Sequence, residues 1–292
     1  MSTLPGEGQI RKSVSSLRRT FMWRRTIAPA LVTFGTTRRI LTVLCLLHVQ
    51  ADANRSIIMV LQRIGFNLLM IAGVGSSISA AAAADITHPT VVELFQSQGC
   101  SSCPPANANV MAIADDPAVL ILSWQVTYWD NLGWKDTFDN PAFTKRQYEY
   151  ADAFHRQQVF TPEVVVNGRS DVVGSRRDEL DALVRQDDRG TGGPSVTIAG
   201  DRVTVSGAGA TSGDVVLLVR YNPNILQVPI RRGENGGRTL PHRNVVRQLA
   251  SLGDWNGQTQ TYTLPAAGEP GLKTAILVQA GRGGPIIAAA RV

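Results

Sequence analysis

The sequence predicts an α/β fold followed by a β-rich C-terminal module. Residues 85–188 alternate short apolar runs with segments of helical spacing, a pattern typical of strands separated by helices. Residues 189–292 instead consist of short candidate strands between glycine-rich turns. The two regions meet in the stretch DDRGTGGP, whose composition is typical of a linker.

The first region is expected to open with a strand–helix–strand unit. Residues 90–95 and 118–125 are short, branched, continuous apolar runs, as in strands that are buried on both faces. Residues 104–114 lie between them and are expected to form a helix. A connection of this kind is almost always right-handed and joins parallel strands.

The rest of the first region predicts two more helices and a hairpin. The helices are expected over residues 141–154 and 176–186. Between them, residues 163–167 and 171–173 flank an Asn-Gly pair at 167–168, which favours a tight hairpin turn.

The second region predicts eight short strands, several of which alternate apolar and polar residues. They are expected over residues 195–199, 202–206, 214–221, 226–231, 243–249, 259–264, 274–280 and 286–292. Such strands favour a sandwich, or a sheet packed on the first region.

The net charge of +6 is concentrated in the N-terminal segment. Residues 1–84 hold 10 of the 29 Lys and Arg but only 2 of the 23 Asp and Glu, so residues 85–292 carry a net charge of −2. A mildly acidic body has no electrostatic reason to bind a phosphate backbone, and no nucleic-acid partner is expected.

The N-terminal segment, residues 1–84, is expected to be a secretory leader. Residues 64–84 are uncharged, follow Arg55 and Arg63, and end in a run of alanines, as a signal peptide does before its cleavage site. A leader of conventional length begins at Met59, so we expect the signal peptide over about residues 59–84. Residues 1–58 are expected to be absent from the native product or disordered. The protein is therefore expected to be periplasmic or secreted, with a membrane anchor only if the leader stays uncleaved.

Cysteine usage agrees with export. Cys45 lies in the leader, so only Cys100 and Cys103 remain after it. The sequence GCSSCP follows a predicted strand and opens a predicted helix, where free backbone N–H groups and the helix dipole lower the pKa of a thiol. We expect Cys100 to be the exposed, attacking sulfur, and Cys103 to be more buried and to resolve the mixed disulfide. Such a dithiol is its own redox centre and needs no cofactor.

Two other roles stay open for this cysteine pair. A static disulfide that closes so short a loop stabilises a protein by only about 1.9 kcal/mol. A metal site needs two further ligands, and outside the leader the candidates are carboxylates and the side chains of His88, His155 and His242. Soft thiolates would suit Cu(I).

A second motif follows later in the first region. Thr161 and Pro162 precede the predicted hairpin, which leads through a glycine to a helix. Together with the strand–CxxC–helix unit, this order resembles the thioredoxin and glutaredoxin fold. The resemblance implies that Pro162 is cis and lies against the CxxC, and that the backbone of Thr161 pairs with an extended substrate segment. The alternative is a proline that opens an edge strand.

Four longer stretches narrow this resemblance. VVELFQSQGCSSCPPANANV, LSWQVTYWDNLGWKDTFDNPAFTKRQ, FTPEVVVNGR and GENGGRTLPHRNVVR are together similar to the DUF1223 family, a group of bacterial secreted thioredoxin-like proteins of unknown function. The similarity extends over nearly all of residues 88–292. The chain departs from it at Gln125 and Thr127, where members often have His and Asp, so it lacks any role that this His has in proton transfer or metal binding.

Glu93 is the only charge in the first predicted strand and lies seven residues before Cys100. Its position resembles that of the buried acid of thioredoxins. Burial would raise the pKa of its carboxyl group and let it shuttle the proton of Cys103. The alternative is a carboxylate tied structurally to an arginine or to backbone N–H groups.

Two loops have unusual compositions. Residues 124–138 contain three Trp and one Tyr, which either line a groove or pack as core. The glycines of residues 233–239 let the backbone approach a ligand or the first region closely, unless this loop is a solvated hairpin. Arg238, His242 and Arg243 beside it could bind an acidic group.

These patterns together predict an exported thiol–disulfide oxidoreductase-like protein that acts on protein thiols and disulfides. Cys100 and Cys103 would exchange disulfides, Thr161 and Pro162 would shape the site, and Glu93 is the candidate proton shuttle. The alternatives are a copper- or metal-handling envelope protein and a non-enzymatic binding protein with a static disulfide.

Overall fold

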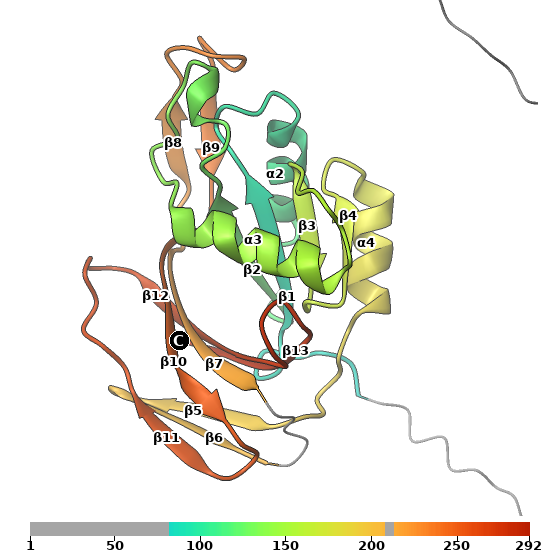
Figure 1. Cartoon of the computed structure of the whole chain (residues 1–292), viewed down its shortest axis with the longest axis vertical. Coiled ribbons are helices and arrows are strands. Elements are labelled where there is room, and N and C mark those ends of the chain that lie inside the picture. The colour runs from blue at the N-terminus through green and yellow to red at the C-terminus, as the bar shows by residue number, and fades with distance from the viewer. Residues whose placement is uncertain (1–81, 208–212) are drawn as a thin grey trace, which may run out of the picture. The chain divides into compact units, whose positions relative to one another are not determined.

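The computed structural model describes residues 82–207 and 213–292, which belong to one compact unit of mixed α/β structure. An eight-stranded sheet has the order β13-β12-β7-β10-β2-β1-β3-β4 (Figure 1). A three-stranded sheet, β11-β6-β5, and a two-stranded hairpin, β8-β9, accompany it. The predicted leader lies outside the described residues except for its last three. Within the described ranges, no helix is long and apolar enough to cross a membrane.

All the helices and strands that were predicted in the first region are present. They are β1 (Thr90–Gln96), α2 (Cys103–Ala112), β2 (Val119–Gln125), α3 (Pro141–Ala153), β3 (Glu163–Val166), β4 (Ser170–Val173) and α4 (Arg177–Gln186). As expected, β1 and β2 are parallel, and β3 and β4 form an antiparallel hairpin. A short 3-10 helix, Asp130–Leu132, lies between β2 and α3.

The second region contains one strand more than predicted. Its strands are β5 (Ser195–Ala199), β6 (Arg202–Ser206), β7 (Asp214–Asn222), β8 (Leu226–Pro229), β9 (Thr239–His242), β10 (Val245–Trp255), β11 (Gln260–Thr263), β12 (Lys273–Gln279) and β13 (Ile286–Arg291). The prediction missed β9, and it ended β10 six residues early because two irregularities in the pairing with β7 interrupt the alternation of that strand.

Strands β1 and β2 are buried along their whole length because both faces of the sheet are covered. On one face, Val91 and Phe95 join a core that includes Phe143 and Tyr150 of α3. On the other face, Val92 and Leu94 pack with residues of α2 and α4. Because neighbours in a strand point to opposite faces, α3 covers one side of these strands while α2 and α4 cover the other (Figure 1).

The Asn167-Gly168 turn connects distant segments. Asn167 and Gly168 both have positive φ, 47° and 62°, as a two-residue hairpin turn requires. The buried side chain of Asn167 accepts a hydrogen bond from the Val91 N–H at 2.8 Å and donates one to the Asp187 carbonyl at 2.8 Å. A side chain at 168 would collide with the backbone of Gly284, so this turn also fixes how closely the chain before β13 approaches.

The strands of the second region extend the sheet of the first. Val245 of β10 pairs in parallel with Ser123 of β2, which puts β10, β7, β12 and β13 into the same sheet. The small β11-β6-β5 sheet packs on these strands through a separate apolar cluster. Thus neither a free-standing sandwich nor a sheet stacked on the first region describes the arrangement. The division into two domains, residues 85–188 and 189–292, stays a prediction.

Candidate functional site

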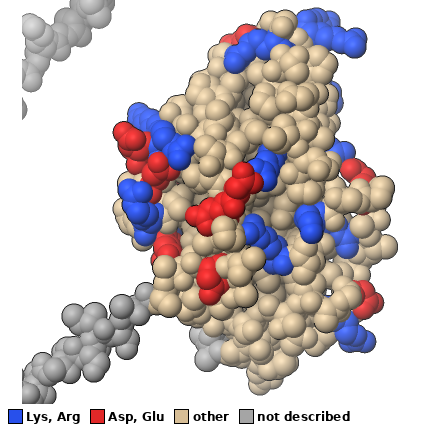
Figure 2. Space-filling view, turned by 180° about the vertical axis from the view of Figure 1, so that it is seen from behind, with Lys and Arg blue, Asp and Glu red and all other residues tan. Residues whose placement is uncertain are grey.

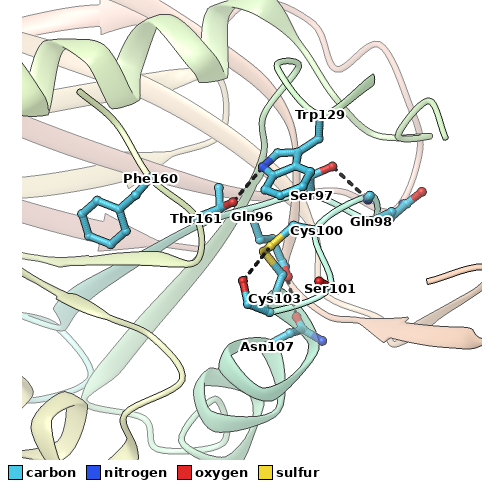
Figure 3. The surroundings of a disulfide bond; sticks show 12 residues. Gln96, Ser97, Gln98, Cys100, Ser101, Cys103, Asn107, Trp129, Phe160 and Thr161 are labelled. Atoms are coloured by element: carbon cyan, nitrogen blue, oxygen red, sulfur yellow. Dashed lines mark hydrogen bonds between the residues drawn. A yellow bond between two sulfur atoms is a disulfide. The ribbon is translucent and has the colours of Figure 1, made fainter. Parts of the chain in front are cut away.

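Cys100 and Cys103 form a disulfide at the point where β1 leads into α2 (Figure 3). Their Cα atoms are 5.4 Å apart. A turn follows the strand, in which the Cys103 N–H donates to the Cys100 carbonyl at 3.2 Å. The Ser102 hydroxyl lies 3.3 Å from Cys100 Sγ, and it must be the donor because a disulfide sulfur carries no hydrogen.

The expected difference in burial between the two sulfurs is wrong. Cys100 is 0% exposed and Cys103 is 1% exposed. The sequence suggested an open Cys100 because the motif begins outside the helix. Segments far along the chain cover it, and local sequence carries no signal of them.

The start of α2 offers fewer free amides than the motif suggested. Pro104 and Pro105 occupy the first turn and have no N–H. The Ser101 N–H donates to the carboxylate of Glu234 at 3.2 Å, and the Cys103 N–H is engaged with Cys100. A thiolate here would therefore be stabilised mainly by the helix dipole and the Ser102 hydroxyl.

The Thr161–Pro162 peptide bond is cis, as the resemblance implied. The Thr161 hydroxyl accepts a hydrogen bond from the indole of Trp129 at 2.8 Å. Figure 3 shows Trp129 and Thr161 beside the disulfide. Trp129 also lies against Gly99, at 3.4 Å from the position where a Cβ would stand. Trp129 therefore touches both motifs, with its indole at Thr161 and its Cβ at Gly99.

A buried polar network, which the sequence did not reveal, holds the segment around the cis proline. Gln147 of α3 donates to the Phe160 carbonyl at 2.7 Å and to the Glu163 carboxylate at 2.6 Å. Arg156 donates to the same carboxylate at 2.9 Å. Burial raises the pKa of Glu163 to about 7, although Gln147 and Arg156 lower it. The network fixes the residues on both sides of Pro162.

Glu93 is held by an arginine on the α3 side of the sheet. Its two carboxylate oxygens accept hydrogen bonds from Arg146 at 2.7 and 2.9 Å, and Tyr150 also donates to it. Glu93 is 0% exposed and Arg146 is 2% exposed. Burial lowers the pKa of Arg146, but the charge and hydrogen bonds of Glu93, together with Tyr150 and Glu149, outweigh it and raise this pKa above its usual value. This geometry matches the structural alternative for Glu93, because Cys103 begins the helix on the opposite face.

Gln98 connects the aromatic loop to the disulfide turn. Its backbone N–H donates to Asp136 at 2.7 Å, and its side-chain oxygen accepts from the indole of Trp134 at 2.9 Å and from the Thr137 N–H at 3.1 Å. Burial raises the pKa of Asp136 to about 7, against two backbone N–H groups that lower it. Of the tryptophans in residues 124–138, Trp124 is fully buried in the core. Trp129 and Trp134 instead connect this segment to Thr161 and Gln98 through their indole N–H groups.

The glycine-rich loop lies against the disulfide turn, so the prediction of a solvated hairpin is wrong for Asn235. Asn235 is 0% exposed, and its amide donates to the carbonyls of Gln98 and Cys100, 2.9 Å each. The Arg238 guanidinium donates to Asn235 at 2.7 Å. The loop therefore approaches the first region closely, which is one of the two uses expected for its glycines.

The basic residues beside this loop do not converge on one point. Arg243 pairs with Asp115 at 2.6 Å on the surface, and Arg238 binds Asn235. His242 is instead 2% exposed and borders a small cavity together with Cys103.

The described residues contain no second candidate site built from metal ligands, and no patch of one charge dominates the face shown in Figure 2. Among these residues, no group of three or more His, Cys, Asp or Glu side chains is arranged to hold a metal ion. On the face shown in Figure 2, basic and acidic side chains alternate over an otherwise uncharged surface.

This chain is similar in sequence and structure to known proteins. The model of a family described as "Protein of unknown function (DUF1223)" matches residues 91–279. Protein AGR_C_4864 from Agrobacterium tumefaciens has a similar crystal structure, with 32% identity and a TM-score of 0.57 over 73% of this chain and 96% of that one. HBP35 of Porphyromonas gingivalis is 12% identical, with a TM-score of 0.47 over 72% of this chain and 76% of that one. No curated protein matches the chain. The family match spans both regions of the fold.

Proposed function

This chain belongs to the DUF1223 family, and we propose that it is an exported protein that exchanges disulfides through Cys100 and Cys103. The observation that carries the proposal is a disulfide between cysteines three positions apart, at the junction of a buried strand and a helix and beside a cis Thr161–Pro162 bond. A disulfide that only stabilised the fold would contribute little across so short a loop.

The thioredoxin-like character of the first region is part of this proposal. It is supported by the parallel β1–α2–β2 unit, the antiparallel β3–β4 hairpin after the cis proline, and α4 after that hairpin. In such an arrangement the disulfide accepts two electrons from two thiols and becomes a dithiol, so no cofactor is required.

Protein thiols and disulfides in the periplasm or outside the cell are the proposed clients. The uncharged stretch of residues 64–84 supports this location, because it has the pattern of a signal peptide. The Cys100–Cys103 disulfide is compatible with it, because disulfides persist in oxidising compartments. A protein segment that paired with the backbone of Thr161 would lie beside Trp129, whose indole donates to the Thr161 hydroxyl, and both cysteines there are buried. We therefore expect protein clients to require movement of the covering loops.

A second candidate function, binding of a soft metal ion such as Cu(I), rests on one observation. His242 borders the same cavity as Cys103, and neither of its ring nitrogens has a hydrogen-bond partner within the described residues. Reduction of the disulfide would free the Cys103 thiolate on the cavity that this imidazole borders, which gives one sulfur and one nitrogen donor.

The test uses the mature protein, purified anaerobically. Equilibration with glutathione redox buffers and an insulin-reduction assay measure exchange, and elemental analysis measures bound metal. We expect a defined reduction potential, insulin reduction, and loss of both in Cys100→Ser/Cys103→Ser. A disulfide that resists dithiothreitol in the native state would contradict the proposal and leave a static disulfide. Stoichiometric copper in the reduced protein would favour the second candidate.

A further inference from the structure

A small cavity opens beside Cys103 and away from Cys100. Its volume is about 40 Å³, and its walls include Cys103, Pro104 and Ala108 of α2 and Leu240, Pro241 and His242 of β9. Of the described residues that line it, only His242 has a side chain that titrates, and Cys103 joins it once the disulfide is reduced. Cys100 is not part of its lining.

His242 is a buried imidazole without a hydrogen-bond partner in the described part of the chain. It is 2% exposed, and both of its ring nitrogens lack partners. Its ring packs on the ring of Phe138 in a T-shaped arrangement, with the ring centroids 6.2 Å apart. Burial lowers the pKa of His242 to about 4, so the ring is neutral at neutral pH and has one N–H that can donate a hydrogen bond. A buried polar group in this state is costly, which points to a role in the cavity that it borders.

The opposite side of the disulfide is closed. Asn235 and Glu234 of the glycine-rich loop bind the turn that contains Cys100. Figure 3 shows Trp129 on this side of the disulfide and Asn107 on the side of Cys103. Asn107 anchors β9 next to α2, because its amide donates to the Pro241 carbonyl at 2.5 Å. The two sulfurs thus have different access although both are buried.

Resting on the exchange chemistry proposed above, we propose that low-molecular-weight thiols react at Cys103 through this cavity, with His242 donating a hydrogen bond to the attacking sulfur. A space of this size admits the CH₂–SH end of a small molecule, and it is far smaller than the pockets that enclose whole ligands. The substrate class is therefore a small aliphatic thiol or its disulfide.

The reaction balances without a further reactant. The small thiol loses its proton to water, and its thiolate, which accepts a hydrogen bond from His242, attacks Cys103 Sγ. The Cys100–Cys103 bond breaks, and Cys100 leaves as a thiolate that accepts a hydrogen bond from Ser102. A second thiol then attacks the bound sulfur, which forms the small disulfide and releases Cys103. Two electrons pass from the two thiols to the protein, and their two protons end on Cys100 and Cys103.

The first test compares two single-thiol proteins with bis(2-hydroxyethyl) disulfide as the probe. In Cys100→Ser only Cys103 can react, and in Cys103→Ser only Cys100 can react. Intact-mass spectrometry follows the mixed disulfide. We expect Cys103 to react about tenfold faster than Cys100, because its side of the site is open. A faster Cys100 overturns this inference and leaves the proposed exchange intact. If neither thiol reacts, and dithiothreitol does not reduce the disulfide of the folded wild-type protein, the proposed function fails as well.

The second test removes the imidazole in the Cys100→Ser protein. His242→Asn should slow Cys103 modification about tenfold at pH 7 and move its pH–rate profile toward that of a free thiol. His155→Asn, at an exposed histidine, is the matched control and should change neither. An unchanged rate and profile in His242→Asn overturns the role of His242.

A variant at the cavity mouth keeps the inference testable if His242→Asn does not fold. Ala108 is exposed on α2 and lines the cavity, so Ala108→Leu should block entry and slow the probe about tenfold without disturbing the core. Ala112→Leu, one turn later on the same helix and also exposed, is the control. Equal rates for the two leucine variants would show that the probe enters elsewhere.

Discussion

At the scale of single residues, Glu93 shows how one side chain can satisfy two different expectations. Its position in the first strand is compatible with a proton shuttle and with a structural carboxylate. The bidentate bond from Arg146 and the bond from Tyr150 use both of its oxygens. Gln279 of β12 also accepts from Arg146 at 3.1 Å, so the charge pair connects α3 with strands of both regions.

We predict that Glu93→Gln destabilises the protein by about 3–5 kcal/mol, because it leaves the Arg146 charge buried without a counter-charge. Chemical denaturation measures the loss. Glu93→Gln/Arg146→Met should recover part of it, since an apolar replacement removes the uncompensated charge. Glu179→Gln breaks an exposed pair with Arg176 and should change the stability by less than about 1 kcal/mol.

The same variant separates the two roles of Glu93. If the carboxylate is structural, Glu93→Gln leaves the pH dependence of thiol modification at Cys103 unchanged under conditions where the variant is folded. A displaced pH profile together with wild-type stability would establish the shuttle instead.

The residues that sequence patterns identify are those with a local signal. The spacing of Cys100 and Cys103 and the pair Thr161-Pro162 are visible within a few positions. The burial and the partners of Asn235, Gln98 and His242 are not visible in this way, because they depend on contacts across the fold. Asn235, for example, binds Gln98 from a distance of 137 residues along the chain. No single-sequence pattern encodes which distant carbonyl an amide will meet.

At the scale of elements, the β8–β9 hairpin changes how the site must be understood. Strand β9 was missed because Pro241 and polar neighbours interrupt it, and proline is uncommon in strands that are not at an edge. A hairpin with only one partner tolerates it. Val228, Ile230 and Leu240 form a small cluster with Trp134 and Phe138, which holds the hairpin against the aromatic loop. The hairpin therefore delivers its glycine-rich loop to the disulfide turn.

We predict that Asn235→Ala loosens this cover. The substitution leaves the carbonyls of Gln98 and Cys100 unpaired and should lower the free energy of unfolding by about 1–3 kcal/mol. Reduction of the native disulfide by dithiothreitol should accelerate several-fold, and amide hydrogen exchange at Ser101 should increase.

An asparagine elsewhere provides the comparison for this variant. Asn256 is exposed, and its side chain only accepts from the Gln258 N–H in a local turn. Asn256→Ala should leave the reduction rate at the wild-type value. Equal reduction rates for Asn235→Ala and the wild type would mean that the loop does not control access to the sulfurs.

At the scale of the whole molecule, the two regions share a sheet and a core. The cluster on the α3 face contains Phe95 and Trp124 from the first region together with Tyr221, Val246 and Leu277 from the second. The two regions join through the pairing of Val245 with Ser123, residues more than a hundred positions apart, so most of the strands could be predicted but not the sheet that they join.

We predict from this shared core that residues 82–292 unfold in one cooperative transition. Trp255→Phe confines fluorescence to the tryptophans of the first region, while hydrogen exchange of the β12 amides reports on the second. The denaturant midpoints of the two probes should coincide. Residues 85–188 alone should remain unfolded, because without β10 the edge of β2 is unpaired and half of the cluster around Trp124 is missing. Two separated midpoints, or a folded fragment, would instead establish an independent domain that ends near residue 188.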